Sequence, residues 1–83
     1  MRVRLSRPPE PTNGFHVDVA ERDEDSPLLD QLTTAIRRAV PQATLTRQLP
    51  GRLCVYAVPV APLAERTERW LRAKQVEVQV VRW

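Results

Sequence analysis

The residues of this chain best suited to chemistry are His16 and Asp18, which lie two positions apart in a strand-like segment. Alternate residues of a strand share a face, so the imidazole and the carboxylate would lie side by side. Such a pair can act as a general base. The sequence ties no nucleophile and no second acid to it, and a surface histidine beside an aspartate is common. We therefore expect no catalytic residues, and an enzyme only if a larger assembly completed the site.

The other reactive residue types favour structural roles. Cys54 is the single cysteine, so an internal disulfide is excluded, and it lies in an apolar run with no cationic residue adjacent to it. Such a cysteine is typically a small buried hydrophobic residue. One histidine and one cysteine without ligand spacing predict no metal site, and Gly14 and Gly51 are explained as turn residues. We expect no cofactor.

The composition is that of one small globular domain. The chain has 83 residues, of which 42% are hydrophobic and 28% charged. The basic N-terminus precedes no apolar signal segment, and the longest uncharged apolar run, Leu53–Ala64, is too short to span a bilayer. We expect no membrane association and, by default, a cytoplasmic protein.

The net charge of +3 hides a strong asymmetry along the chain. Residues 10–30 hold seven acidic side chains and one basic one, whereas the rest holds twelve basic and three acidic ones. All basic residues except Lys74 are arginine. This bias has two interpretations, an arginine surface for phosphate or carboxylate groups and the codon usage of a GC-rich genome.

The elements that must position these residues occur in an order that repeats after 35 residues. Pro27-Leu28 and Pro62-Leu63 each open a helical stretch, and strand-like segments precede and follow both helices. These strands are expected at Phe15–Ala20, Ala43–Gln48, Leu53–Val58 and Val76–Trp83. This order predicts an α+β, ferredoxin-like split βαβ sandwich, with two helices on a four-stranded, mainly antiparallel sheet.

The N-terminal residues are expected to add to this plan without changing it. Met1–Arg7 alternates between apolar and charged residues, which predicts an optional fifth strand at an edge of the sheet. The proline-rich residues 7–14 form a connector. We therefore predict a single domain, 1–83, in which residues 1–14 precede a βαββαβ core at 15–83.

The two helices and one strand carry the predicted core. Ser26 is the expected N-cap of the first helix, which Pro41 ends. The second helix is expected from Pro62 to about Lys74, with Trp70 on its apolar stripe and therefore in the core. Leu53–Val58 is apolar on both faces, which predicts an interior strand without deciding which face meets the helices.

The first functional hypothesis is a protein interface on the sheet face that the helices leave open. Apolar groups on such a face suggest that something covers it. The expected interface residues are His16, Tyr56, Val81 and Trp83. They would bind a protein partner or a second copy of the chain. Alternatively, residues 1–14 fold over this face, or Trp83 frays.

The second hypothesis is binding of RNA or DNA through arginine. Sheets of this class that bind RNA stack bases on aromatic residues of central strands, and here only Tyr56 could serve. The phosphate-contacting set would be Arg37, Arg38, Arg47, Arg52, Arg66, Arg69, Arg72 and Arg82. The acidic residues 18–25 would repel a polyanion if they lay nearby.

Overall fold

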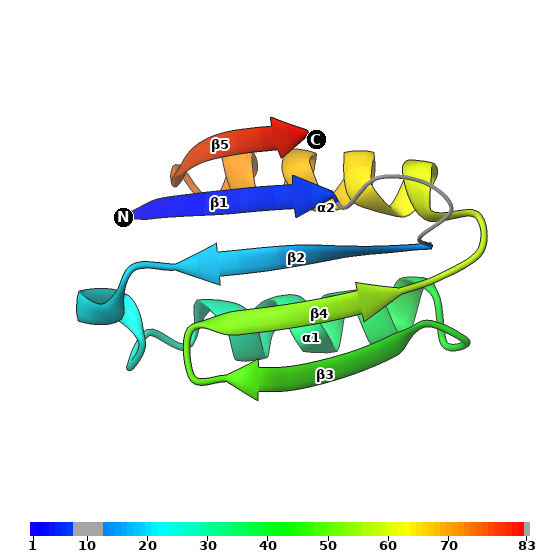
Figure 1. Cartoon of the computed structure of the whole chain (residues 1–83), viewed down its shortest axis with the longest axis horizontal. Coiled ribbons are helices and arrows are strands. Elements are labelled where there is room, and N and C mark those ends of the chain that lie inside the picture. The colour runs from blue at the N-terminus through cyan, green and yellow to red at the C-terminus, as the bar shows by residue number, and fades with distance from the viewer. Residues whose placement is uncertain (8–12, 83) are drawn as a thin grey trace.

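The computed structural model describes residues 1–7 and 13–82, without the side chains of Gln48 and Arg82. Within these residues the chain forms five strands, two α-helices and a short 3₁₀ helix (Figure 1). The elements are β1 (Arg2–Arg7), β2 (Gly14–Val19), the 3₁₀ helix η1 (Glu21–Asp23), α1 (Leu28–Ala39), β3 (Thr44–Leu49), β4 (Arg52–Tyr56), α2 (Val60–Ala73) and β5 (Glu77–Arg82).

The five strands form one mixed sheet in the order β3-β4-β2-β1-β5. Neighbouring strands are antiparallel except β1 and β5, which run parallel. Both helices cover the same face of the sheet, α1 behind β3 and β4 and α2 behind β1 and β5 (Figure 1). The sheet therefore has a helix-covered face and a face that no helix covers, which we call the open face.

The α+β class is confirmed, and the N-terminal segment does supply the optional fifth strand, but the sheet is a five-stranded mixed sheet with one parallel pair, and the edge position predicted for that strand is wrong. The strand β1 lies inside the sheet, between β2 and β5, and not at an edge. The arginines along one face of β1 suggest an edge, but such alternation reports only which face of a strand meets solvent. Val3 and Leu5 are 0% and 2% exposed on the helix side, whereas Arg2 and Arg4 are exposed on the open face.

The helix boundaries follow from local chemistry. Helix α1 begins at Leu28 with Pro27, not the expected Ser26, as its N-cap residue, while the Ser26 hydroxyl accepts a hydrogen bond from the Leu28 amide at 3.2 Å. The second helix begins at Val60, two residues before the predicted start at Pro62. A proline in the first helical turn lacks only an amide that has no intrahelical partner, so Pro62 fits inside α2.

The core lies between the helices and the covered sheet face. It is built from Val3 and Leu5 of β1, Phe15 and Val17 of β2, Leu53 and Val55 of β4, and apolar residues of both helices. The undecided orientation of the Leu53–Val58 segment is thereby settled. Leu53 and Val55 meet the helices, Cys54 and Tyr56 lie on the open face, and Val58 follows the strand with 77% of its surface exposed.

Candidate functional site

The open face is divided into two patches by the register of its strands. One row across all five strands joins Thr46, Cys54, His16, Ser6 and Val81, and the next contains Thr44, Tyr56 and Gly14. We call these eight residues the tyrosine patch. Towards the opposite end of the strands lie Arg52, Asp18, Arg4, Gln79, Arg2 and Glu77, which we call the ionic patch.

Tyr56 is the large exposed side chain of the tyrosine patch, with 40% of its surface accessible. Its ring lies against Gly14 on the neighbouring strand. A Cβ atom at Gly14 would lie 2.7 Å from the ring atom Cδ1 of Tyr56, closer than van der Waals contact allows. The glycine is therefore required for the position of the ring, and the sheet presents an aromatic surface at this place.

The ionic patch contains two ion pairs that differ in length and in burial. The Nε atom of Arg52 donates to Oδ1 of Asp18 at 2.6 Å, between half-buried side chains. This hydrogen bond raises the pKa of the Arg52 guanidinium, so Arg52 stays charged. The second pair, Arg2 with Glu77, is longer at 3.5 Å and more exposed. Beside them Arg2, Arg4, Asp18 and Gln79 line a shallow hollow of about 270 Å³.

The pairing with Arg52 decides the role of Asp18. This carboxylate is oriented by a guanidinium, and the described residues include no hydrogen bond from His16 to it. Cys54, beside His16 in the tyrosine patch, is fully buried, and burial raises the pKa of its thiol. Within the described residues no group of three or more metal-ligating side chains forms. Among the described residues, the patch therefore offers surface for contact and no assembled general base or thiolate.

Three of the four predicted interface residues lie together on the open face. His16 and Val81 belong to the same row, separated by Ser6, and Tyr56 lies in the adjacent row. All three are at least partly exposed. The fourth, Trp83, lies outside the described residues.

The predicted arginine set does not form one surface. Arg52 lies on the open face and is paired with Asp18, while Arg47 bonds Asp30 of α1 and the Pro50 carbonyl. Arg72 pairs with Glu68 one helical turn away. Four others, Arg37, Arg38, Arg66 and Arg69, are exposed on the helices without an ion pair among the described residues. The side chain of Arg82 lies outside the described residues. Sequence alone gives the positions of arginines but not their tertiary partners.

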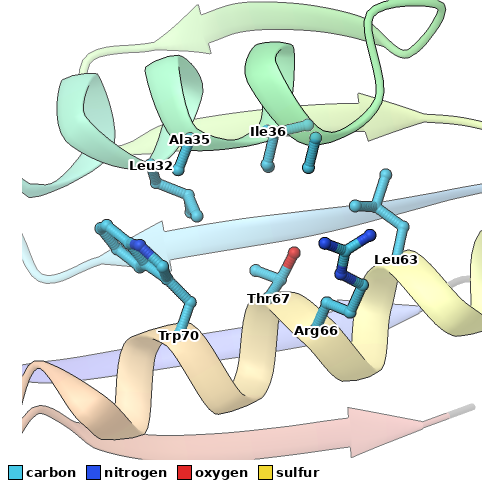
Figure 2. A pocket seen from close by; sticks show the side chains of 8 residues that line it. Leu32, Ala35, Ile36, Leu63, Arg66, Thr67 and Trp70 are labelled. Atoms are coloured by element: carbon cyan, nitrogen blue, oxygen red, sulfur yellow. The ribbon is translucent and has the colours of Figure 1, made fainter.

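Sequence reasoning missed a groove between the two helices on the covered side of the sheet (Figure 2). Without β1, the strand order would leave β5 next to β2. Instead β1 separates them and widens the sheet by one strand spacing, about 4.8 Å. The backbones of α1 and α2 consequently do not run in close contact. A groove of about 170 Å³ remains, walled by Leu32, Ala35, Ile36 and Ala39 of α1 and by Leu63, Arg66, Thr67 and Trp70 of α2.

Trp70 forms one end of this groove and is not a core residue in the sense predicted. It is partly buried, it packs against the core from outside, and the Lys74 ammonium lies 5.0 Å from its ring centroid. The apolar stripe of α2 did predict that the Trp70 side chain lies on the core side of this helix. The degree to which Trp70 is buried could not be predicted, because it depends on the spacing between the two helices.

Thr67 is the unusual residue of the groove. It is 2% exposed, and its Oγ1 atom is buried without a hydrogen-bond partner among the described residues. Threonine in a helix commonly bonds a carbonyl one turn back. Thr33 and Thr34 of α1 do so, to Leu29 at 2.8 Å and to Asp30 at 3.2 Å. The Thr67 hydroxyl instead points towards α1 (Figure 2), and an unsatisfied buried group of this kind costs about 1–3 kcal/mol.

Comparison with models of protein families, with curated proteins and with solved structures finds no match for this chain. In the described part of the chain no helix combines the length and hydropathy that crossing a membrane requires. The function must therefore be argued from the two surfaces themselves.

Proposed function

We propose that this protein is a non-catalytic binding module whose tyrosine patch contacts another protein, and that the first partner to test is a second copy of the chain. The observation that carries the proposal is the exposure of Tyr56, 40% of its surface, on a sheet face that no described element covers. Tyrosine is enriched among the residues that dominate binding energy at protein interfaces.

The surroundings of Tyr56 support an interface rather than a solvent-facing sheet. The other members of the tyrosine patch include no carboxylate, guanidinium or ammonium group, and the Tyr56 ring occupies the space that Gly14 leaves free of a side chain. Depletion of charge at the centre of a contact and charge at its rim are typical of protein interfaces. The adjoining ionic patch supplies that rim, where charged groups fix orientation more than they add affinity.

The proposal is tested by light scattering or sedimentation of the untagged 9.5 kDa chain over a range of concentrations. We expect reversible association that Tyr56→Ser abolishes. The matched control is Val58→Ser, which removes a more exposed apolar side chain outside the open face, between β4 and α2. A monomer at every concentration would exclude the second copy as the partner. Equal loss of association in both variants would exclude the tyrosine patch.

A second candidate is binding of nucleic acid by the helix layer, because Arg37, Arg38, Arg66 and Arg69 are exposed there without ion pairs among the described residues. Such arginines can bind phosphates, and removing one arginine–phosphate pair reduces the slope of log affinity against log salt by about 0.7–0.9. The double variant Arg37→Gln, Arg69→Gln in a fluorescent oligonucleotide titration tests it. Binding that is absent in the wild-type chain, or a slope that the variant leaves unchanged, would reject this candidate.

A further inference from the structure

We propose that the groove between α1 and α2 binds a small amphipathic carboxylate. The apolar body of the ligand would lie between the two helices beside Trp70. Its carboxylate would accept hydrogen bonds from the Arg66 guanidinium and the Thr67 hydroxyl. This site is on the opposite side of the sheet from the tyrosine patch and does not depend on the function proposed for that patch.

The unpartnered hydroxyl is the first observation that points to a ligand. Oγ1 of Thr67 is buried and has no hydrogen-bond partner among the described residues, although the same residue type at two positions of α1 bonds the helix backbone. Figure 2 shows this hydroxyl and the Arg66 guanidinium both directed from α2 towards α1, with Leu32 and Ile36 opposite. A donor that is kept free inside an apolar groove fits an acceptor supplied from outside.

The positive charge around the groove favours a negatively charged ligand. The residues that line it, and those of the two adjoining hollows at its ends, include three cations, Arg38, Arg66 and Lys74. None of the described lining residues is acidic. Arg66 has no ion pair among the described residues, so its planar guanidinium is available for a carboxylate, the group whose geometry it matches best.

The size of the groove limits the size of the apolar part of the ligand. Its volume of about 170 Å³ compares with the engineered apolar cavity of about 150 Å³ that binds benzene. The small side chains Ala35 and Ala39 of α1 leave this space open, and the Trp70 ring closes one end. A single aromatic ring or an aliphatic group of similar size would fill the groove, with the carboxylate beside Arg66.

The probe is sodium phenylacetate, with phenylacetamide as the uncharged control of nearly identical shape. Each is titrated into the ¹⁵N-labelled full chain while the amide and indole resonances are followed, and Trp70→Phe identifies the Trp70 indole signal. We expect saturable shifts at Trp70, Thr67 and Ala35 with phenylacetate, with a dissociation constant on the order of 1 mM. Phenylacetamide should bind at least about tenfold more weakly.

Three variants of groove residues and one control variant outside the groove separate the contributions of the charge, the hydroxyl and the apolar space. Arg66→Met should weaken phenylacetate binding by about tenfold or more, whereas Arg69→Met, an exposed arginine of the same helix that does not line the groove, should change it less than about twofold. Thr67→Val preserves the shape and removes the hydroxyl, and should weaken binding severalfold. Ala35→Leu fills the groove with a good helix former and should abolish the shifts in a protein that stays folded.

Four results would overturn the proposal. They are no saturable shift with phenylacetate, equal binding of acid and amide, equal effects of Arg66→Met and Arg69→Met, and undiminished binding by folded Ala35→Leu. The spectrum of each variant without ligand reports whether it is folded, so loss of structure is recognised separately from loss of binding.

Discussion

The two faces of the sheet differ in how their polar groups are satisfied. On the open face, the ionic patch pairs its charges across strands, with Arg52 bonded to Asp18 and Arg2 to Glu77. On the helix side, the groove places one hydroxyl, that of Thr67, among apolar walls without a partner among the described residues. Polar groups on an open sheet can use water or neighbouring strands, whereas a buried one needs a specific acceptor. The comparison marks the groove as the more specialised surface.

Both surfaces depend on the position of β1. On the open face this strand supplies Arg2 and Arg4 to the ionic patch and Ser6 to the tyrosine patch. On the covered side it contributes Val3 and Leu5 to the core and increases the distance between the helices. A four-stranded sheet would lack both the ionic patch as found and the groove.

The largest expected change in stability distinguishes the buried face of β1 from its exposed face. Leu5→Ala should lower the free energy of unfolding by about 2–5 kcal/mol, because Leu5 is 2% exposed in the core. Arg4→Ala, one residue away on the open face, should change it by no more than about 0.5 kcal/mol. Urea denaturation of the two variants measures the difference. Similar values for both would contradict the burial of Leu5 between β1 and the helices.

The next largest effect on stability is expected from the ion pairs of the open face, whose two pairs should differ in their contribution. Asp18→Asn removes the charge from a short, half-buried pair with Arg52 and should cost about 1 kcal/mol. Glu77→Gln acts on the longer and more exposed pair with Arg2 and should cost less than about 0.5 kcal/mol. Thermal unfolding at low and high salt checks the ranking, and a larger loss for Glu77→Gln would reverse it.

In the groove we expect a smaller change in stability, and in the opposite direction. Thr67→Val should leave stability unchanged or raise it by up to about 1 kcal/mol, because it removes a buried hydroxyl that lacks a partner among the described residues. Thr33→Val removes a hydroxyl that bonds the Leu29 carbonyl and should not stabilise the protein. Denaturant midpoints of the two variants provide the test. Clear destabilisation by Thr67→Val would mean that the hydroxyl is already satisfied.

The smallest effect concerns Cys54 and appears only at alkaline pH. Burial raises the folded-state pKa of this thiol, so the folded chain retains its proton more tightly than the unfolded chain. Its contribution to stability is fully present below the unfolded-state pKa of about 8.5 and is lost as the pH rises through the folded-state value. Wild-type protein should therefore lose stability above that pH more steeply than Cys54→Ala. Parallel pH profiles of the two proteins would contradict the buried thiol.

The sequence was sufficient to locate the strands and helices but not to arrange them. The strands expected at Phe15–Ala20 and Val76–Trp83 are found as β2 and β5, and their alternate apolar residues lie in or against the core. The same alternation in β1 could not reveal its neighbours, since side-chain period carries no information on strand order. The interior place of β1 was therefore missed.

The candidate sites show the same limit. Side-chain parity follows from sequence and was enough to place His16 and Val81 on one face, whereas the face of Tyr56 was left undecided and is given only by the structure. The groove depends on strand order and on the surroundings of Thr67, and neither is a property of the local sequence. Likewise, the predicted arginine surface is divided because Arg47 and Arg52 are held by carboxylates distant in the chain.

We propose that the two sides of the sheet are separate binding surfaces and that self-association is confined to the tyrosine patch. The most direct test is a dilution series of the ¹⁵N-labelled chain without ligand, read as amide chemical shifts for every residue. We expect concentration-dependent shifts at His16, Thr46, Tyr56 and Val81, and constant shifts along the groove at Ala35 and Thr67. Shifts that move only along the helices, or that stay constant everywhere, would contradict it.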